Sequence, residues 1–181
     1  LREGLKKAGD ITDNAPLRSG KGSLYEGGIR VPWLFRQPGR IAPGICDTPI
    51  SGIDLYPTLL EIAGAARPDA VARDGVSCAP LLKGGTIERD ALFWHFPGYL
   101  GAGGNTWRTT PVSVIRSGPW KLMEFFEDGR LELYHLKDDV GETRNLAAQE
   151  PARVSELHAR LKAWRQELKA PLPAPNQNGR K

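Results

Sequence analysis

The chain has 181 residues, of which 40% are apolar and 25% are charged, a composition typical of a globular protein with its own core and not of a disordered tail. Its 21 Gly and 15 Pro indicate short elements joined by shaped loops and exclude a coiled coil. The net charge of +4 is concentrated in residues 151–181, away from any cluster of exposed aromatic residues, so we expect no nucleic-acid partner. No apolar run approaches the ~20 residues that cross a bilayer, so we expect no membrane span.

The chain starts at Leu1 and its only methionine is Met123, so we expect a piece of a longer protein that carries no export signal itself. Cys46 and Cys78 are far apart and have no second cysteine pair, which is not a metal-binding spacing. A disulfide between them stays open.

The first half of the chain combines a glycine-rich loop with one strand and one helix. Residues 1–28 are polar and too interrupted for a regular element. The apolar run Ile29–Phe35 predicts a strand buried on both faces, and Pro32 places it near an edge or a bulge. A helix of about ten residues is predicted between Asp54 and Gly64, because Asp54 can cap the free amides and Gly64 can adopt the left-handed stop.

The second half changes to strand-like periodicity. Four short runs predict a small antiparallel sheet: Ala91–Phe96, Val112–Arg116, Trp120–Phe126 and Arg130–Leu136. The last two flank a hairpin turn with Gly129 at the position that needs positive φ. A helix opening at Pro151 carries one apolar stripe, which we expect to cover one face of that sheet: Val154, Leu157, Leu161, Trp164 and Leu168.

Lys21 lies between Gly20 and Gly22 in the first loop. Its ammonium can reach into a cleft, while the flanking glycines let the backbone approach a ligand closely. This arrangement suits a phosphate or sulfate group, with Arg18 or Arg30 nearby. The spacing differs from that of the Walker loop, and a solvated lysine in a flexible turn is the alternative.

Two series of segments carry a family pattern. The first half contributes Asn14–Pro32, Gln37–Gly39, Ser51–Leu59, Asp74–Ser77 and Pro80–Leu82. The second half contributes Phe93–Pro97, Arg116–Leu122, Leu133–Leu136 and Glu142–Leu146. In this order they resemble the C-terminal half of the formylglycine-dependent (type I) sulfatases, over nearly the whole chain.

This resemblance implies an α/β fold, namely the C-terminal part of an alkaline-phosphatase-like sulfatase fold with a small four-stranded antiparallel sheet packed by a C-terminal helix. Residues 1–90 would complete the α/β catalytic domain, 91–170 would form the sheet-plus-helix subdomain, and 171–181 would be an irregular tail. The resemblance also implies hydrolysis of sulfate monoesters, in which the hydrate of formylglycine attacks sulfur while calcium holds the sulfate oxygens. A periplasmic or secreted location follows by resemblance only.

By the same resemblance, Lys21 is the catalytic lysine that binds the sulfate and supports the bridging or departing oxygen. The formylglycine motif C/S-x-P-x-R is absent around Cys46 and Cys78. The metal-binding Asp-Asn pair of the family falls at or before Leu1. We therefore expect the nucleophile and the calcium ligands to lie in a missing N-terminal sulfatase segment, no metal site in this chain, and no activity of the chain alone.

His95, Arg18 and Trp107 are the candidate substrate-binding residues. His95 can hydrogen-bond a sugar hydroxyl, or it can be a core or edge histidine with a backbone partner. Trp107 can offer its ring to a sugar or aryl group at the rim formed with Gly98–Asn105, or this stretch can be a mobile loop.

Two acidic stretches resemble ligand sets only superficially. Asp13-Asn14 can coordinate calcium through oxygen, but an Asx turn is the preferred interpretation. The stretch Asp138–Glu142 lacks regular calcium-loop spacing and indicates a structural turn. His135 and His158 are expected to belong to the scaffold or the surface.

The expected ligand is a sulfated small molecule or glycan. The alternatives are a phosphate or phosphonate ester hydrolase of the same superfamily, since tetrahedral oxyanions of either element suit the same lysine and metal, and a non-catalytic binding module. The nucleophile upstream of Leu1 distinguishes sulfate from phosphate chemistry.

Overall fold

The computed structural model describes residues 13–66, 74–103 and 106–174, and the chain is a mixture of helices and strands. It divides into two compact units, one from Leu1–Val31 with Ala91–Lys181 and the other from Pro32–Asp90. The predicted boundaries at residues 90 and 170 stay a prediction. Within the described ranges, no helix combines the length and the apolar character needed to span a membrane.

The unit Pro32–Asp90 is built around the predicted helix. A 3-10 turn, η1 (Gly52–Asp54), leads into α2 (Leu55–Ala63), which ends at Gly64 in the left-handed conformation (φ 66°), and a second short turn is η2 (Leu81–Lys83). The helix prediction is therefore confirmed, but the capping role of Asp54 differs. Its carboxylate accepts the backbone N–H of Ser51, which closes the start of η1, and makes no cap bond to α2.

The predicted strand Ile29–Phe35 is wrong for the chain described here. Ile29 ends a short helix, α1 (Glu26–Ile29), and residues 30–37 have no regular structure. Leu34 is 92% exposed and Val31 is 66% exposed. A strand needs a neighbour for its ladder of hydrogen bonds, and the described residues pair no strand with this segment.

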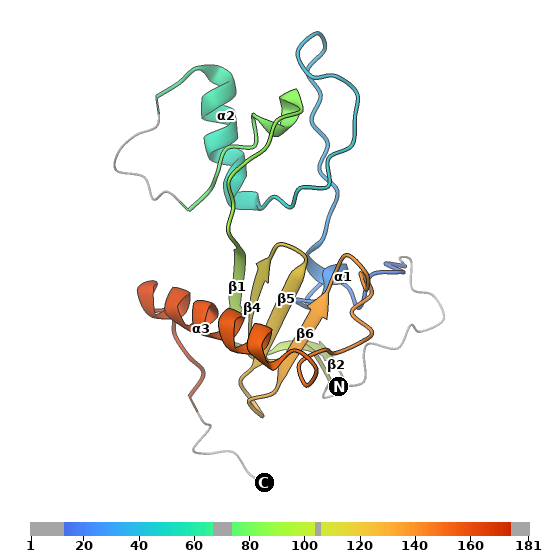
Figure 1. The fold of residues 1–181 in the computed structure, drawn as a ribbon, viewed down its shortest axis with the longest axis vertical. Helices are drawn as coiled ribbons and strands as arrows, with labels where there is room; N and C mark the ends of the chain where they lie inside the picture. Colours follow the sequence, from blue (N-terminus) through green and yellow to red (C-terminus); the bar gives the residue numbers. More distant parts are fainter. Residues whose placement is uncertain (1–12, 67–73, 104–105, 175–181) are drawn as a thin grey trace. The chain divides into compact units, whose positions relative to one another are not determined.

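The four predicted strands and their sheet are confirmed. They run as β1 (Leu92–Phe96), β4 (Val112–Ser117), β5 (Trp120–Phe125) and β6 (Leu131–His135). The sheet order is β1-β4-β5-β6, every pair is antiparallel (Figure 1), and Gly129 has φ 69° in the turn between β5 and β6.

A second, two-stranded sheet was not predicted. It consists of β2 (Leu100–Gly103) and β3 (Thr106–Thr109), between β1 and β4 in sequence. The register is irregular between Leu100 and Gly103. The glycine-rich sequence of this hairpin therefore shows no strand periodicity. Residues 104 and 105, part of the stretch considered as a pocket rim, lie outside the described residues.

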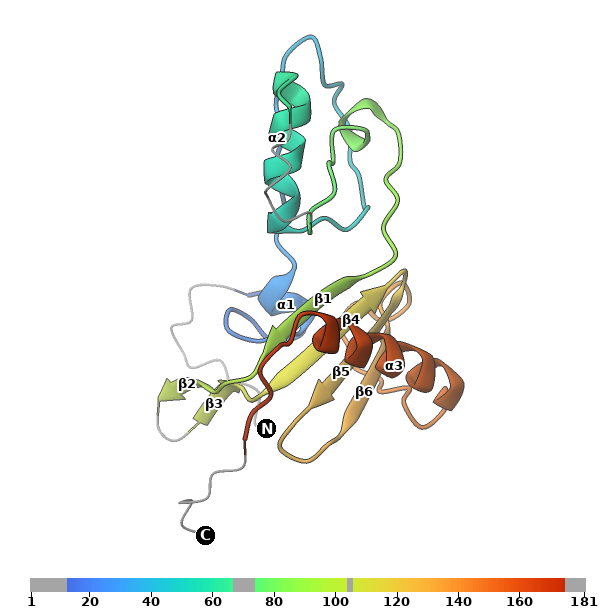
Figure 2. The same cartoon turned by 90° about the vertical axis from the view of Figure 1, so that its left-hand side faces the viewer.

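One face of the four-stranded sheet is covered by α3 (Pro151–Glu167), as Figures 1 and 2 show. The predicted stripe packs against the sheet: Leu157 and Leu161 are buried, and Trp164 stacks on Phe93 of β1 with ring centroids 4.8 Å apart. Leu168 is 54% exposed because it caps the helix instead of continuing it.

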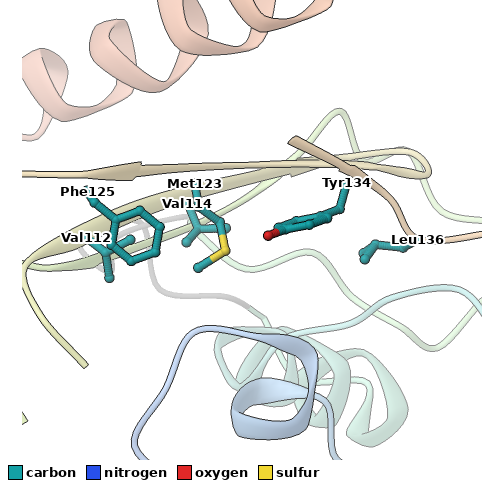
Figure 3. Packing of buried hydrophobic residues seen from close by; sticks show 6 residues of the cluster. All are labelled: Val112, Val114, Met123, Phe125, Tyr134 and Leu136. Carbon is teal, nitrogen blue, oxygen red and sulfur yellow. The ribbon is translucent and has the colours of Figure 1, made fainter. Parts of the chain in front are cut away.

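The opposite face of the sheet carries a second buried cluster of side chains (Figure 3): Val112, Val114, Met123, Phe125, Tyr134 and Leu136. Leu24 and Tyr25 of the first loop pack against it. Figure 3 shows α1 on this side of the sheet and α3 on the other. The glycine-rich loop is therefore the cover of this second face.

Candidate anion-binding site

The turn that carries Lys21 is fixed by its neighbours on both sides. The backbone N–H of Ser23 donates to the carbonyl of Gly20 (3.1 Å), which closes the turn. Gly22 has φ 95°, a conformation that strains a residue with a side chain, and a Cβ atom there would lie 2.7 Å from Leu100 of β2. Arg108 of β3 donates to the Lys21 carbonyl (3.3 Å). The sequence predicts that the backbone around Lys21 approaches a ligand closely. In the structure this backbone packs against the β2–β3 hairpin, and Lys21 is exposed.

Arg18 lies in the same loop and is held by the sheet. Its guanidinium Nη1 donates to the hydroxyl of Tyr134 and to the backbone carbonyl of Glu142, each at 2.9 Å. The guanidinium also lies 4.0 Å from the ring centre of Tyr25. These contacts anchor the loop, and the predicted substrate contact of Arg18 stays a prediction.

Tyr25 and Tyr134 share one carboxylate, that of Glu132 on β6. Their hydroxyls donate to Glu132 Oε2 at 2.7 and 2.9 Å. Burial, followed by the nearby negative charge of Glu132, raises the pKa of both phenols well above the usual range. Both phenols therefore remain hydrogen-bond donors at neutral pH.

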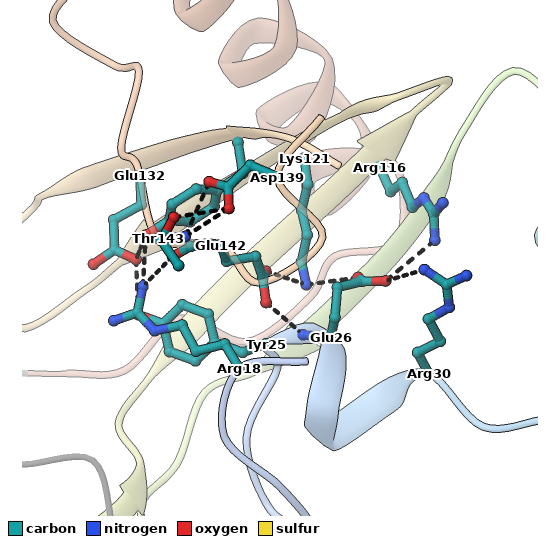
Figure 4. Close-up of polar contacts among 11 residues, drawn as sticks. Arg18, Tyr25, Glu26, Arg30, Arg116, Lys121, Glu132, Asp139, Glu142 and Thr143 are labelled. Atoms are coloured by element: carbon teal, nitrogen blue, oxygen red, sulfur yellow. Dashed lines mark hydrogen bonds and ion pairs between the residues drawn. The ribbon is translucent and has the colours of Figure 1, made fainter. Parts of the chain in front are cut away.

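A network of buried charges joins the loop to the sheet (Figure 4). The ammonium of Lys121 on β5 lies 3.0 Å from Glu26 Oε1 and 2.8 Å from Glu142 Oε1. The second oxygen of Glu26 faces Arg116 (3.5 Å) and Arg30 (3.9 Å). Glu26, Lys121 and Glu142 are all fully buried. Burial raises the pKa of Glu142, while Lys121 opposes that shift.

Sequence reasoning overlooked this network, although one signal for it exists. Every second residue of β5 points to the same face of the sheet. Lys121 therefore shares its face with Met123 and Phe125, which are buried where the loop packs. On β4, Arg116 shares this face with Val114, and it is the residue paired with Lys121 of β5. Charges at inward positions of two adjacent strands require buried partners of opposite sign.

His95 of β1 uses both of its ring nitrogens inside the protein. Nδ1 lies 2.6 Å from the hydroxyl of Ser113, the residue of β4 that pairs with His95, and Nε2 lies 2.7 Å from the carbonyl of Pro171. Because a carbonyl only accepts, Nε2 is the donor in its contact with Pro171. His95 thus has the backbone partner that one interpretation required, and its substrate role stays a prediction.

Trp107 lies on β3, next to Arg108, and is 47% exposed. Its ring packs against Tyr99, with ring centroids 5.1 Å apart, and over Gly101 on the neighbouring strand. Arg108 instead contacts Gly22 and the Lys21 carbonyl. Successive side chains of a strand point to opposite faces, so Trp107 projects from the other side of the hairpin than the Lys21 turn.

The two acidic stretches form turns. Asp13 accepts the backbone N–H of Ala15 (2.9 Å), which is the expected Asx turn, and Asn14 donates to the carbonyl of Ser19 (3.2 Å). Asp139 accepts the backbone N–H groups of Thr143 and Arg144, each at 2.9 Å. The carboxylates are therefore already occupied by backbone donors, as expected for structural turns.

In the ranges that the structure describes, no group of three or more His, Cys, Asp or Glu side chains is arranged to hold a metal ion. The carboxylates of Asp13 and Asp139 accept local backbone N–H groups. Cys46 and Cys78 are both free thiols, the first exposed and the second buried, so they form no disulfide.

Comparison with known proteins defines the class. A family model described as N-sulphoglucosamine sulphohydrolase, C-terminal, matches residues 20–170. The chain therefore belongs to the sulfatase family and corresponds to a C-terminal portion of it. The resemblance predicted from the sequence is thereby confirmed, as is a mixed α/β chain whose structural neighbours are sulfatases of the alkaline-phosphatase-like fold.

The chain is similar to a protein named sulfatase from Formosa agariphila, with 42% identity over 84% of this chain and 30% of that protein. It is similar to human arylsulfatase A, with 36% identity over 87% of this chain and 34% of the relative. Among solved structures, that of Ps i-CgsB in complex with k-i-k-neocarrahexaose matches with a TM-score of 0.68 and 27% identity, over 84% of this chain and 32% of that one. The chain thus spans about a third of the length of these relatives.

Proposed function

We propose that this chain is the part of a sulfatase that supplies the sulfate-binding lysine, Lys21, and one wall of the substrate pocket. The observation that carries the proposal is the turn itself. It holds a single exposed ammonium on a backbone that is fixed by Gly20, Gly22 and the Arg108 guanidinium. A sulfate ester requires a cation near its non-bridging oxygens, because its negative charge is spread over them.

In this proposal, Lys21 neutralises charge on the sulfate so that an anionic nucleophile can approach sulfur in line, and it supports the bridging or departing oxygen. The formylglycine and calcium that the family implies would supply the nucleophile and further charge from outside this chain. The proposal therefore includes that the chain alone does not turn over substrate. The solved structure with k-i-k-neocarrahexaose and the name arylsulfatase A support, respectively, a glycan and a small aryl ester as candidate substrates.

The direct test is titration of the chain with sodium sulfate, against sodium chloride at equal ionic strength, observed by NMR. Sulfate should shift the amide signals of Gly20, Lys21 and Gly22, and Lys21→Ala should abolish the effect. Lys137→Ala, which removes an exposed lysine elsewhere in the same unit, should leave it unchanged. The absence of a sulfate-specific shift in the unaltered chain would refute the proposal.

Three further measurements test the remaining parts. Titration with inorganic phosphate addresses the phosphate-ester alternative, because a preference for phosphate over sulfate would favour it. An assay of the chain with an aryl sulfate and calcium addresses the division of labour, because turnover above background would contradict it. Fusion of the chain to the N-terminal part of arylsulfatase A should give aryl sulfate hydrolysis that Lys21→Ala removes.

A further inference from the structure

The loop from Arg18 to Gly27 is closed at its base by one residue from a distant turn. The backbone N–H of Gly27 donates to the carbonyl of Arg18 (2.9 Å), which brings the two ends of the loop together. Glu142 binds both ends: its backbone carbonyl accepts the Arg18 guanidinium at 2.9 Å, and its carboxylate accepts the N–H of Glu26 at 2.6 Å. Lys21 lies within the loop whose two ends Glu142 holds together.

We propose that Glu142, with Glu26 and Lys121, positions the Lys21 turn for anion binding, an inference that rests on the proposed role of Lys21. Glu142 is a positioning residue because it acts on the loop backbone and not on the anion. Its backbone has φ 52°, a conformation that side-chain-bearing residues rarely adopt, so the surrounding contacts hold it there. The sheet contributes through Lys121, whose ammonium joins the Glu26 and Glu142 carboxylates.

The composition of the loop explains why ion pairs, in addition to apolar contacts, hold it in place. A loop rich in Gly and Ser offers few apolar side chains, and within it Leu24 and Tyr25 pack against the buried cluster of the sheet. Buried ion pairs add little net stability compared with apolar packing of the same volume, but they fix direction and distance when every partner is present. The Glu26–Lys121–Glu142 network therefore sets where the loop lies more than how stable the unit is.

The positioning role of Glu142 is tested with a matched pair of variants in the full 181-residue chain. Glu142→Ala removes the acceptor of the Glu26 N–H, whereas Glu142→Gln keeps an oxygen in the same place. Both replacements are side-chain-bearing residues at the same positive φ, so backbone strain is equal in the two. Misplacement of a binding group by about 1 Å can cost up to about a hundredfold. We expect Glu142→Ala to weaken sulfate binding by about tenfold or more, and Glu142→Gln to restore most of it.

Hydrogen exchange supplies the second readout. In Glu142→Ala, the amides of Gly27 and Ser23 should lose protection, while the amides of β4 and β5 should keep theirs. Lys162→Met, which removes an exposed lysine from α3 on the opposite face of the sheet, should change neither measurement. Equal sulfate affinity in Glu142→Ala, Glu142→Gln and the unaltered chain would overturn the inference.

Lys121→Met gives an independent test if Glu142→Ala does not fold. It leaves the buried carboxylates of Glu26 and Glu142 without their shared cation, with only Arg116 and Arg30 facing Glu26. A carboxylate in this position must take up a proton to stay buried. Sulfate binding by Lys121→Met should therefore recover as the pH falls from 8 to about 5, relative to the unaltered chain over the same range.

A pH profile of Lys121→Met that parallels the unaltered chain, with the same affinity, would contradict the positioning role. Failure of the proposed function would look different. If the unaltered chain does not bind sulfate at all, the role of Lys21 is refuted, and the inference built on it falls too. If the unaltered chain binds sulfate and the Lys121 and Glu142 variants bind it equally well, only the positioning role is refuted.

Discussion

Asp54 is the residue on which we expect the unit Pro32–Asp90 to depend most. Its carboxylate is fully buried and accepts three donors: the Ser51 N–H on Oδ2 (2.6 Å), and the Val76 N–H (2.9 Å) and the Arg89 guanidinium (2.6 Å) on Oδ1. Both oxygens are therefore acceptors, and they tie α2 to the segment around Val76 and to Arg89. The change Asp54→Asn keeps the shape of the side chain and alters only this chemistry.

The magnitude follows from the donors that Asn cannot satisfy. Its amide has one oxygen and one NH₂, so either Ser51 or the pair Val76 and Arg89 meets a donor instead of an acceptor in each orientation. The ion pair to Arg89 is lost as well, in a place where the Arg89 side chain is only 12% exposed. Removing one partner of a buried ion pair costs about 3–5 kcal/mol, so Asp54→Asn should destabilise this unit by that amount.

Hydrogen exchange measured by mass spectrometry is the suitable assay, because it reports each unit separately. Amides of α2 should exchange roughly a hundredfold faster or more in Asp54→Asn, as about 3 kcal/mol implies, while those of β4 and β5 should be unchanged. Asp47→Asn, at an exposed aspartate of the same unit, is the matched control. Unaltered protection of α2 in Asp54→Asn would refute the reasoning.

Three further outcomes are expected. A Cβ atom in Gly27→Ala would overlap the carbonyl oxygens of Arg18 and Ser19, so the variant should lose about 1–3 kcal/mol of stability in urea unfolding, unlike Gly98→Ala, whose nearest neighbours are 3.8 Å away. Leu161→Ala, at a fully buried position between α3 and the sheet, should cost about 2–5 kcal/mol in the same experiment, and a loss below 1 kcal/mol would contradict the packing described. Burial opposes ionisation of Glu124, but hydrogen bonds from His158 and Arg165 outweigh it and lower its pKa. A carboxyl whose folded pKa is depressed stabilises the fold above its unfolded pKa, and this stability is lost as the pH falls through the folded pKa. Glu124→Gln should therefore flatten the decline in urea stability below about pH 4.5, and Glu167→Gln, at an exposed position of α3, should not.

The second half of the chain was predictable because its local signals agree with its packing. β4 and β5 are short runs that contain Val, Ile, Trp and Phe, Gly129 supplies the positive φ of the turn, and Leu157 and Leu161 repeat at helical spacing. Each signal depends on residues close in sequence. Tertiary structure then confirmed what each segment favoured by itself.

The failures share a different cause. The run Ile29–Phe35 has the composition of a buried strand, but composition does not provide the neighbouring strand that the ladder requires. The β2–β3 hairpin was missed for the converse reason, since its glycines carry no periodicity although its backbone pairs. Lys21 and Trp107 belong to different predicted subdomains, and the sequence does not reveal that Arg108, and not Trp107, contacts the Lys21 turn.

The proposed anion site extends this contrast to energetics. The face of the sheet under α3 is covered by an amphipathic helix, whose apolar stripe would pack adequately in several slightly shifted positions. The opposite face is covered by the loop that carries Lys21, and there Lys121 occupies an inward position of β5 where an apolar residue would give more stability. Ion pairs lie on both faces of the sheet, since Arg165 of α3 meets Glu124 of β5 at 2.6 Å under the helix, but only the Glu26–Lys121–Glu142 network among these described charges is fully buried.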